Sequence, residues 1–181
     1  DIACPWCYIG KRNLEKGLAA LAEGEDAPAV EVTFHSYQLQ PDAEVDFDGT
    51  HDEYLAKYVG MSADQAAASA QHISNLGAQA GLEYNFDRMK QTNTLLAHQL
   101  ADFVKEKGRQ AEMKERLMAA HFTDGRHVGH IDDLVDLAVE IGLDAEETRV
   151  ALEGERYLDA VRQDIAQAQA YGIQGVPFFV I

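Results

Sequence analysis

Two short segments of this chain have the pattern of a β-strand, and they stand near its opposite ends. Val30, Val32 and Phe34 alternate with polar residues, which is the two-residue period of a strand with one buried face. The closing run 177–181 is bulky and apolar, as in a buried strand. Nearly everything between these segments has helical spacing. This order predicts an α/β fold in which a β-α-β unit is interrupted by a large, all-helical insertion.

The helical patterns carry start and stop signals. Apolar residues at near-helical spacing predict a first helix that begins at the cysteine motif and ends near Ala22. Thr50 and Ser62 each open a capping box, and Gly60 and Gly81 stand where these two helices should end. Further helices are predicted at about 92–107, 110–124, 131–141, from 144 onward, and at 155–171.

We therefore expect residues 1–45 to form the first half of the sheet-containing part and residues 156–181 its second half. Residues 46–155 are expected to form the inserted helical domain. The chain starts three residues before its first cysteine and stops in mid-strand, so we expect both termini of the biological protein to be truncated here. Whether a signal peptide precedes Asp1 is left open.

The charge of the chain excludes some classes of partner. Acidic residues number 31 and basic residues 15, for a net charge of −16. Nucleic acids and anionic membrane surfaces are bound by clustered positive charge, so we expect neither as a partner. No apolar run is long enough to cross a bilayer.

The only two cysteines stand together in Cys4-Pro5-Trp6-Cys7. Since no cysteine remains to form a structural disulfide, this pair is expected to be chemical, and the cytoplasm is the favoured compartment. A helix N-terminus stabilises a thiolate, so we predict a lowered pKa for Cys4. Cys7, one helical turn on, can resolve a mixed disulfide between Cys4 and a substrate. The pattern predicts thiol–disulfide exchange, for which no metal or organic cofactor is needed.

A zinc site is the alternative interpretation of the cysteine pair. Structural zinc usually has four ligands, and His127 and His130 are the residues that could complete the set. They lie far along the chain beside a glycine, and no further cysteine is present. The pattern therefore favours redox chemistry over metal binding.

Residues 1–10, together with Gly175-Val176-Pro177-Phe178-Phe179, resemble the DsbA family of thiol–disulfide oxidoreductases, specifically its FrnE-like branch. The resemblance covers essentially the whole chain. It implies a thioredoxin-like fold with a helical insertion over the active site. It also implies that the Val176-Pro177 peptide bond is cis and faces the cysteines, where the backbone of Val176 would pair with an extended substrate segment.

Two other side chains are candidates for substrate contact. Trp6, between the cysteines, offers an apolar surface to a peptide or an aromatic substrate. His98, in a stretch similar to one in FrnE-like relatives, is predicted to lie on a helix that covers the active site. There it would shuttle a proton or contact the substrate, whereas a buried structural role is its ordinary alternative.

The expected partner is a protein or small molecule that carries a disulfide or a thiol, with glutathione among the candidates. The main rival function is a glutathione-dependent isomerase or transferase, similar to 2-hydroxychromene-2-carboxylate isomerases and kappa-class transferases. Those enzymes need one serine or cysteine, so the second cysteine, Cys7, favours redox exchange. A non-enzymatic chaperone that holds unfolded chains is a third hypothesis, based only on the aromatic residues near the two motifs.

Overall fold

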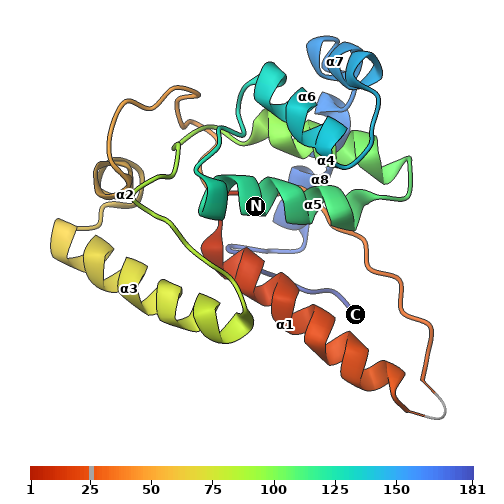
Figure 1. The fold of residues 1–181 in the computed structure, drawn as a ribbon, viewed down its shortest axis with the longest axis horizontal. Coiled ribbons are helices and arrows are strands. Elements are labelled where there is room, and N and C mark those ends of the chain that lie inside the picture. Colours follow the sequence, from red (N-terminus) through yellow and green to blue (C-terminus); the bar gives the residue numbers. More distant parts are fainter. Residues whose placement is uncertain (25–26) are drawn as a thin grey trace.

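The computed structural model describes residues 1–24 and 27–181, and within these ranges all regular structure is helical. None of the described helices is long and apolar enough to cross a membrane. The helices, shown in Figure 1, are α1 (Pro5–Ala22), α2 (His51–Val59), α3 (Ala63–Ala80), α4 (Leu95–Lys105), α5 (Gln110–Ala119), the π-helix η1 (Ala120–Asp124), α6 (Ile131–Glu140), α7 (Ala145–Glu153) and α8 (Leu158–Ala170).

The predicted ends of the first three helices are confirmed. Both capping boxes are formed: the side chains of Thr50 and Ser62 accept the amide hydrogen three residues on, and the side chain there returns a bond to the cap's own amide. Gly60 and Gly81 end α2 and α3 in the left-handed conformation that glycine adopts without steric cost.

Three other helix boundaries differ from the predictions. α4 begins at Leu95, because the side chain of Asn93 accepts the Leu95 amide at 2.9 Å and so competes with helical hydrogen bonding before that residue. The predicted helix 110–124 changes to π geometry at Ala120. α8 begins at Leu158, since Glu155 has a φ of 48° and a left-handed residue interrupts a helix.

The predicted strands are not formed. Residues 27–38 and 178–181 run without a hydrogen-bonded ladder in the part of the chain that the structure describes. A strand needs a second backbone as its partner. Here the amide of Phe34 donates to Gln110 Oε1 at 3.0 Å, and Gln110 Nε2 donates to the Phe34 carbonyl at 2.8 Å. A side-chain amide therefore satisfies backbone groups for which the alternating pattern predicted a strand partner.

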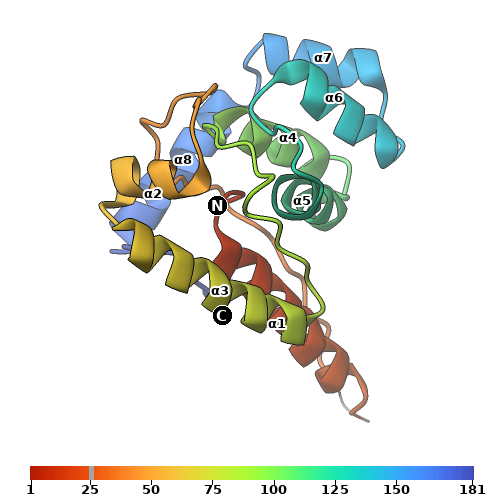
Figure 2. The same cartoon turned by 60° about the vertical axis from the view of Figure 1, so that its left-hand side comes forward.

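The larger apolar cluster surrounds α4, which contacts α5, α6, α7 and α8 and lies among them in Figure 2. Its largest buried side chains include Leu100 and Phe103 of α4, Leu117 of α5, Leu134 of α6 and Leu152 of α7. These apolar faces explain why the middle of the chain reads as helical and packs as one body.

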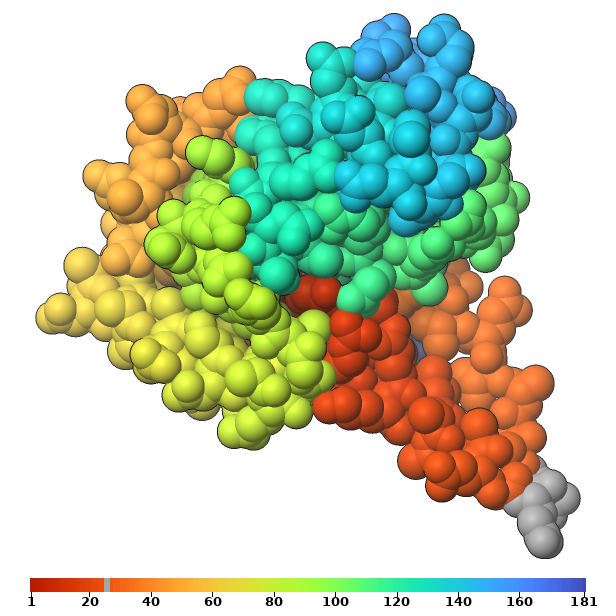
Figure 3. All heavy atoms as spheres, in the orientation of Figure 1, coloured from red at the N-terminus to blue at the C-terminus, as the bar shows by residue number. Residues whose placement is uncertain are grey.

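A second apolar cluster encloses the cysteines. It joins Cys4 and Tyr8 to Ile73 of α3, Met118 of α5 and Phe122 of η1. The rings of Tyr8 and Phe122 stack with their centroids 6.1 Å apart. Figure 3 shows the start of α1 (red) between α3 (yellow) and α5 (green). The cysteine motif is therefore held by helices that come later in the chain.

Candidate thiol–disulfide site

Cys4 and Cys7 lie at the N-terminus of α1, where Pro5 occupies the first helical position. Proline suits this position, because the amide hydrogen that it lacks would have no partner within the helix there. Cys4 is the N-cap, and its Sγ accepts the Cys7 amide at 3.3 Å. Both thiols are free and buried, with 2% of Cys4 and 9% of Cys7 exposed. The motif therefore places both sulfurs in one helical turn.

The two thiols form one hydrogen-bonded unit. The hydrogen bond from Cys4 lowers the pKa of Cys7 to about 6, although burial opposes this shift. The same bond, together with burial, raises the pKa of Cys4. The lowered pKa therefore falls on Cys7 and not on Cys4, for which the helix N-terminus predicted it. The reason is that Cys4 stays protonated, and its hydrogen bond stabilises Cys7 as the thiolate. The pair therefore releases one proton near neutral pH and retains the other.

The motifs from the two ends of the chain meet at Cys4. Its Sγ lies 3.6 Å from the carbonyl oxygen of Val176. The peptide bond between Val176 and Pro177 is cis. Pro177 packs so closely on α1 that a Cβ placed on Gly10 would lie 2.9 Å from Pro177 Cγ. A glycine at that position is what allows the proline ring to approach the helix beside the cysteines.

A groove of about 660 Å³ runs beside the motif. Trp6 stands in it with 40% of its surface exposed. No charged side chain lines this groove among the described residues; its walls come from α1, α3 and the second motif, and are Trp6, Ile9, Gly10, Asn13, Leu76, Gln79, Ala80, Val176 and Pro177. Three of the predicted site residues are thus brought together beside Cys4, in a neutral and largely apolar groove.

His98 lies in the interior of the protein, outside the groove. It is 1% exposed, and its Nε2 is 3.3 Å from Asp1 Oδ1, which also accepts a hydrogen bond from Thr94 Oγ1 at 3.0 Å. The backbone nitrogen of Asp1 lies 3.6 Å from Cys7 Sγ. Burial and the nearby charge of Lys114 hold the pKa of His98 well below its usual value, so the imidazole is neutral. His98 does not line the groove, and it reaches Cys7 only through Asp1.

Lys114 of α5 is a buried cation that the sequence reasoning did not single out. Burial lowers its pKa, and the nearby charge of Cys7 opposes that shift. In return, the positive charge of Lys114 contributes to the lowered pKa of Cys7. The helical spacing of Gln110, Met113 and Leu117 with Lys114 is the signal that would have placed this lysine on the buried face of its helix.

The zinc site considered from the sequence is not assembled. Among the described residues, the group whose donor atoms are close enough to share a metal ion joins His127 and His130 to Asp46. Neither cysteine belongs to it. The cysteine pair and the histidine pair are thus separate features of the molecule.

Known protein families and proteins are similar to this chain over its whole length. The family model described as "DSBA-like thioredoxin domain" matches residues 1–181. The protein YwbO of Bacillus subtilis (strain 168), which is described as uncharacterized, is 31% identical over 183 residues, covering 100% of this chain and 83% of that protein.

Two solved structures are similar. The crystal structure of the probable DsbA oxidoreductase SCO1869 from Streptomyces coelicolor has a TM-score of 0.88 and 38% identity, over 98% of this chain and 76% of that one. The cytosolic disulfide reductase DsbM from Pseudomonas aeruginosa has a TM-score of 0.59 and 19% identity, over 98% and 79% of the two chains. The second likeness concerns the fold alone.

Proposed function

This chain belongs to the family of DSBA-like thioredoxin domains, and on that premise we propose that it catalyses thiol–disulfide exchange through Cys4 and Cys7. The observation that carries the proposal is the pair of free thiols in one turn at the N-terminus of α1, where Cys4 Sγ accepts the Cys7 amide and lies 3.6 Å from the carbonyl oxygen of Val176. The lowered pKa of Cys7 agrees with it. At neutral pH such a pair already carries a thiolate, which is the reactive species in exchange.

The two sulfurs have different surroundings, and these suggest their roles. Cys4 contacts Val176, a residue that lines the groove, whereas Cys7 faces Asp1 on the inner side. In the reductive direction, Cys4 passes its proton to Cys7 and attacks a substrate disulfide as the thiolate. A mixed disulfide forms, and the released substrate thiolate takes the proton from Cys7. The Cys7 thiolate then attacks Cys4 Sγ, closes the Cys4–Cys7 bond and releases the second substrate thiolate.

Two electrons pass from the cysteine pair to the substrate in this sequence of steps. The oxidative direction is the same sequence reversed, with a substrate dithiol as the electron donor. The positive charge of Lys114 favours the thiolate form of Cys7, both when Cys7 attacks and when it is the leaving group.

The groove favours a peptide substrate over glutathione. Glutathione carries two carboxylates, which are usually held by cations. The groove walls offer none. Of the cations of α1, Lys11 and Arg12 are paired with Glu115, and Lys16 donates to the backbone carbonyl of Gln79 at 3.5 Å. An extended peptide with an apolar side chain beside its cysteine suits the uncharged walls and the exposed Trp6. We therefore propose a protein or peptide disulfide as the substrate class.

The middle part of the chain, residues 46–155, is proposed as the helical insertion in a thioredoxin-like frame formed by 1–45 and 156–181. Two contacts support a role for this middle part at the site: α3 supplies one wall of the groove, and η1 packs on the cysteine helix. A cytoplasmic location is part of the proposal, because the only two cysteines are both in the motif and none is left for a structural disulfide.

The test is a redox titration combined with trapping. In thiol–disulfide buffers, the fluorescence of Trp6, the only tryptophan, should follow one reversible two-electron transition. Cys4→Ser should lose exchange activity on a peptide disulfide. Cys7→Ser should accumulate a mixed disulfide with the peptide, detectable by mass spectrometry, because the resolving thiol is gone.

Two outcomes would reverse this assignment. If Cys7→Ser keeps its full rate with a glutathione substrate, the protein is a glutathione-dependent isomerase or transferase. If Cys4→Ser still exchanges the peptide disulfide, the thiol pair is not the site. Trp6→Ala serves as a test of the groove: it should raise KM for an apolar peptide disulfide and leave the rate with a small disulfide unchanged.

A further inference from the structure

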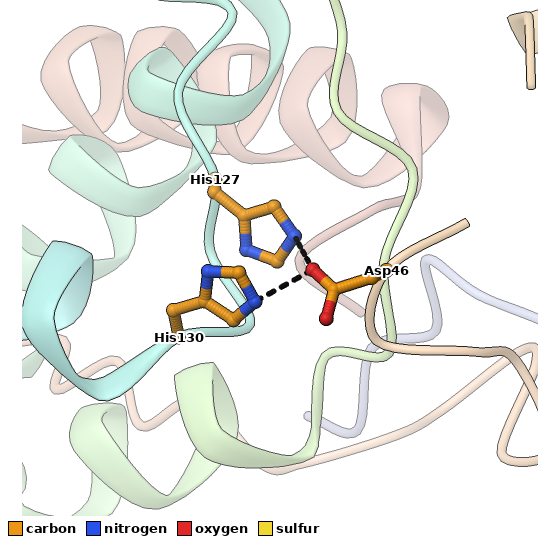
Figure 4. Close-up of side chains that lie close together, drawn as sticks. All are labelled: Asp46, His127 and His130. Carbon is orange, nitrogen blue, oxygen red and sulfur yellow. Dashed lines mark ion pairs between the residues drawn. The ribbon is translucent and has the colours of Figure 1, made fainter. Parts of the chain in front are cut away.

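A second cluster of reactive side chains lies outside the cysteine site, on two loops. Asp46 precedes α2, whereas His127 and His130 precede α6, and Figure 4 shows both imidazoles facing the same carboxylate. Asp46 Oδ1 lies 2.7 Å from His130 Nε2 and 3.7 Å from His127 Nε2. One donor atom from each residue lies within 4.8 Å of the other two.

We propose that Asp46, His127 and His130 bind a divalent transition metal ion of the zinc type, with water completing a four-coordinate shell. Two imidazoles and one carboxylate are a donor set that suits zinc and its neighbours in the periodic table, whereas magnesium and calcium prefer oxygen donors alone. This site is independent of the cysteine pair and of the exchange reaction.

The distances are close to what a metal ion requires. Bonds of 2.0–2.1 Å at tetrahedral angles place neighbouring donor atoms about 3.3 Å apart. The two measured separations from Asp46 Oδ1, 2.7 Å and 3.7 Å, lie on either side of this value. The imidazole rings are stacked, with centroids 3.8 Å apart and planes 13° from parallel, so they must tilt toward each other to share an ion. The side chain of His130 is 44% exposed, which leaves room for that tilt.

His127 must exchange one set of bonds for another. Its Nδ1 accepts the Gly129 amide at 3.0 Å, so the ring proton is on Nε2, which is 3.1 Å from the Val45 carbonyl oxygen. Metal binding at Nε2 transfers that proton to Nδ1 and gives up both hydrogen bonds. Only a metal that binds imidazole strongly can offset this loss, which again selects zinc-like ions over magnesium and calcium.

Two surrounding features favour a cation here. Asp133 Oδ2 lies 3.6 Å from His130 Nδ1, on the opposite side of the ring from Asp46. A carboxylate behind a metal-bound histidine is a common arrangement that orients the ring and strengthens it as a ligand. In addition, Asp46 and His127 border a cleft of about 750 Å³ in whose wall the acidic groups, which include Asp48, Asp52 and Asp87, outnumber the basic Arg88 and Lys90. The negative field of these groups attracts a cation.

The experiment is a calorimetric titration of the full chain, free of any affinity tag, with Zn²⁺. The Cys4→Ser/Cys7→Ser double variant is used, so that no thiol competes for the ion. One Zn²⁺ should bind per chain. His130→Ala and Asp46→Asn should each weaken binding by more than about 10-fold, and Asp133→Asn by about 10-fold. Mg²⁺ should not compete.

The matched control is His35→Ala. His35 forms a similar pair with Asp164, with 2.7 Å between His35 Nδ1 and Asp164 Oδ1, but belongs to no three-residue group of metal donors among the described residues. Its loss should leave the affinity unchanged. The side chain of Asp46 is 74% exposed, so its replacement should leave the fold intact, which circular dichroism checks. Failure of the double variant to bind Zn²⁺, or binding that persists in His130→Ala or Asp46→Asn, overturns the proposal.

Discussion

The pH dependence of the reduction potential tests the pKa values of the two thiols. The pKa of Cys7 is lowered from an ordinary value of 9.0 to about 6, and the pKa of Cys4 is raised. Between these two values the reduced pair holds one proton. Reduction of the disulfide therefore takes up two protons below about pH 6 and one proton above it.

The slope of the potential follows from this count. Two protons per two electrons change the potential by about 59 mV per pH unit, and one proton by about 30 mV. The slope should therefore halve near pH 6 and stay at the lower value to at least pH 9. A lowered folded pKa contributes stability that is fully present above the unfolded pKa and is lost as pH falls through the folded one. At pH 7 the reduced protein should gain on the order of 1 kcal/mol from this group.

The assay is Trp6 fluorescence in thiol–disulfide buffers from pH 5 to pH 9, with the potential fitted at each pH. As a control, Cys4→Ala removes the hydrogen bond to Cys7, and the pKa of Cys7, measured by thiolate absorbance, should then rise by more than one unit. A slope that remains near 59 mV per pH unit up to pH 8 would refute the reasoning, since both thiols would then have ordinary pKa values.

Four further substitutions test the packing and one helix cap. Gly10→Ala should reduce exchange activity, because its Cβ meets Pro177 at 2.9 Å, whereas Gly17→Ala in the same helix meets nothing within 4 Å and should stabilise the protein by about 0.5–1 kcal/mol in thermal unfolding. Thr50→Ala should cost about 1 kcal/mol by denaturant titration, since the capping box of α2 is lost. His121→Leu should stabilise by about 1–3 kcal/mol, because both ring nitrogens are buried without a partner; an unchanged unfolding midpoint would contradict this.

Local sequence signals predicted the helices well, because caps and helical periodicity act over a few residues. Thr50 and Ser62 open their helices, and Gly60 and Gly81 close them, as their patterns indicate. The starts of α4 and α8 were missed, since they depend on a side-chain bond and on one left-handed residue rather than on periodicity. The strand pattern at Phe34 was misleading, because alternation reports a half-buried segment and says nothing about its hydrogen-bond partner.

The cysteine motif by itself determined that two thiols lie in one turn at a helix N-terminus, because that depends on four consecutive residues. Only the tertiary structure decided that Cys7 has the lowered pKa, since the direction of one hydrogen bond and the charge of Lys114 from α5 lower it against the opposing effect of burial. It likewise buried His98 and brought Asp46 to the two histidines. Such contacts join residues that are distant in sequence, and the packing of apolar helix faces, not local preference, places them side by side.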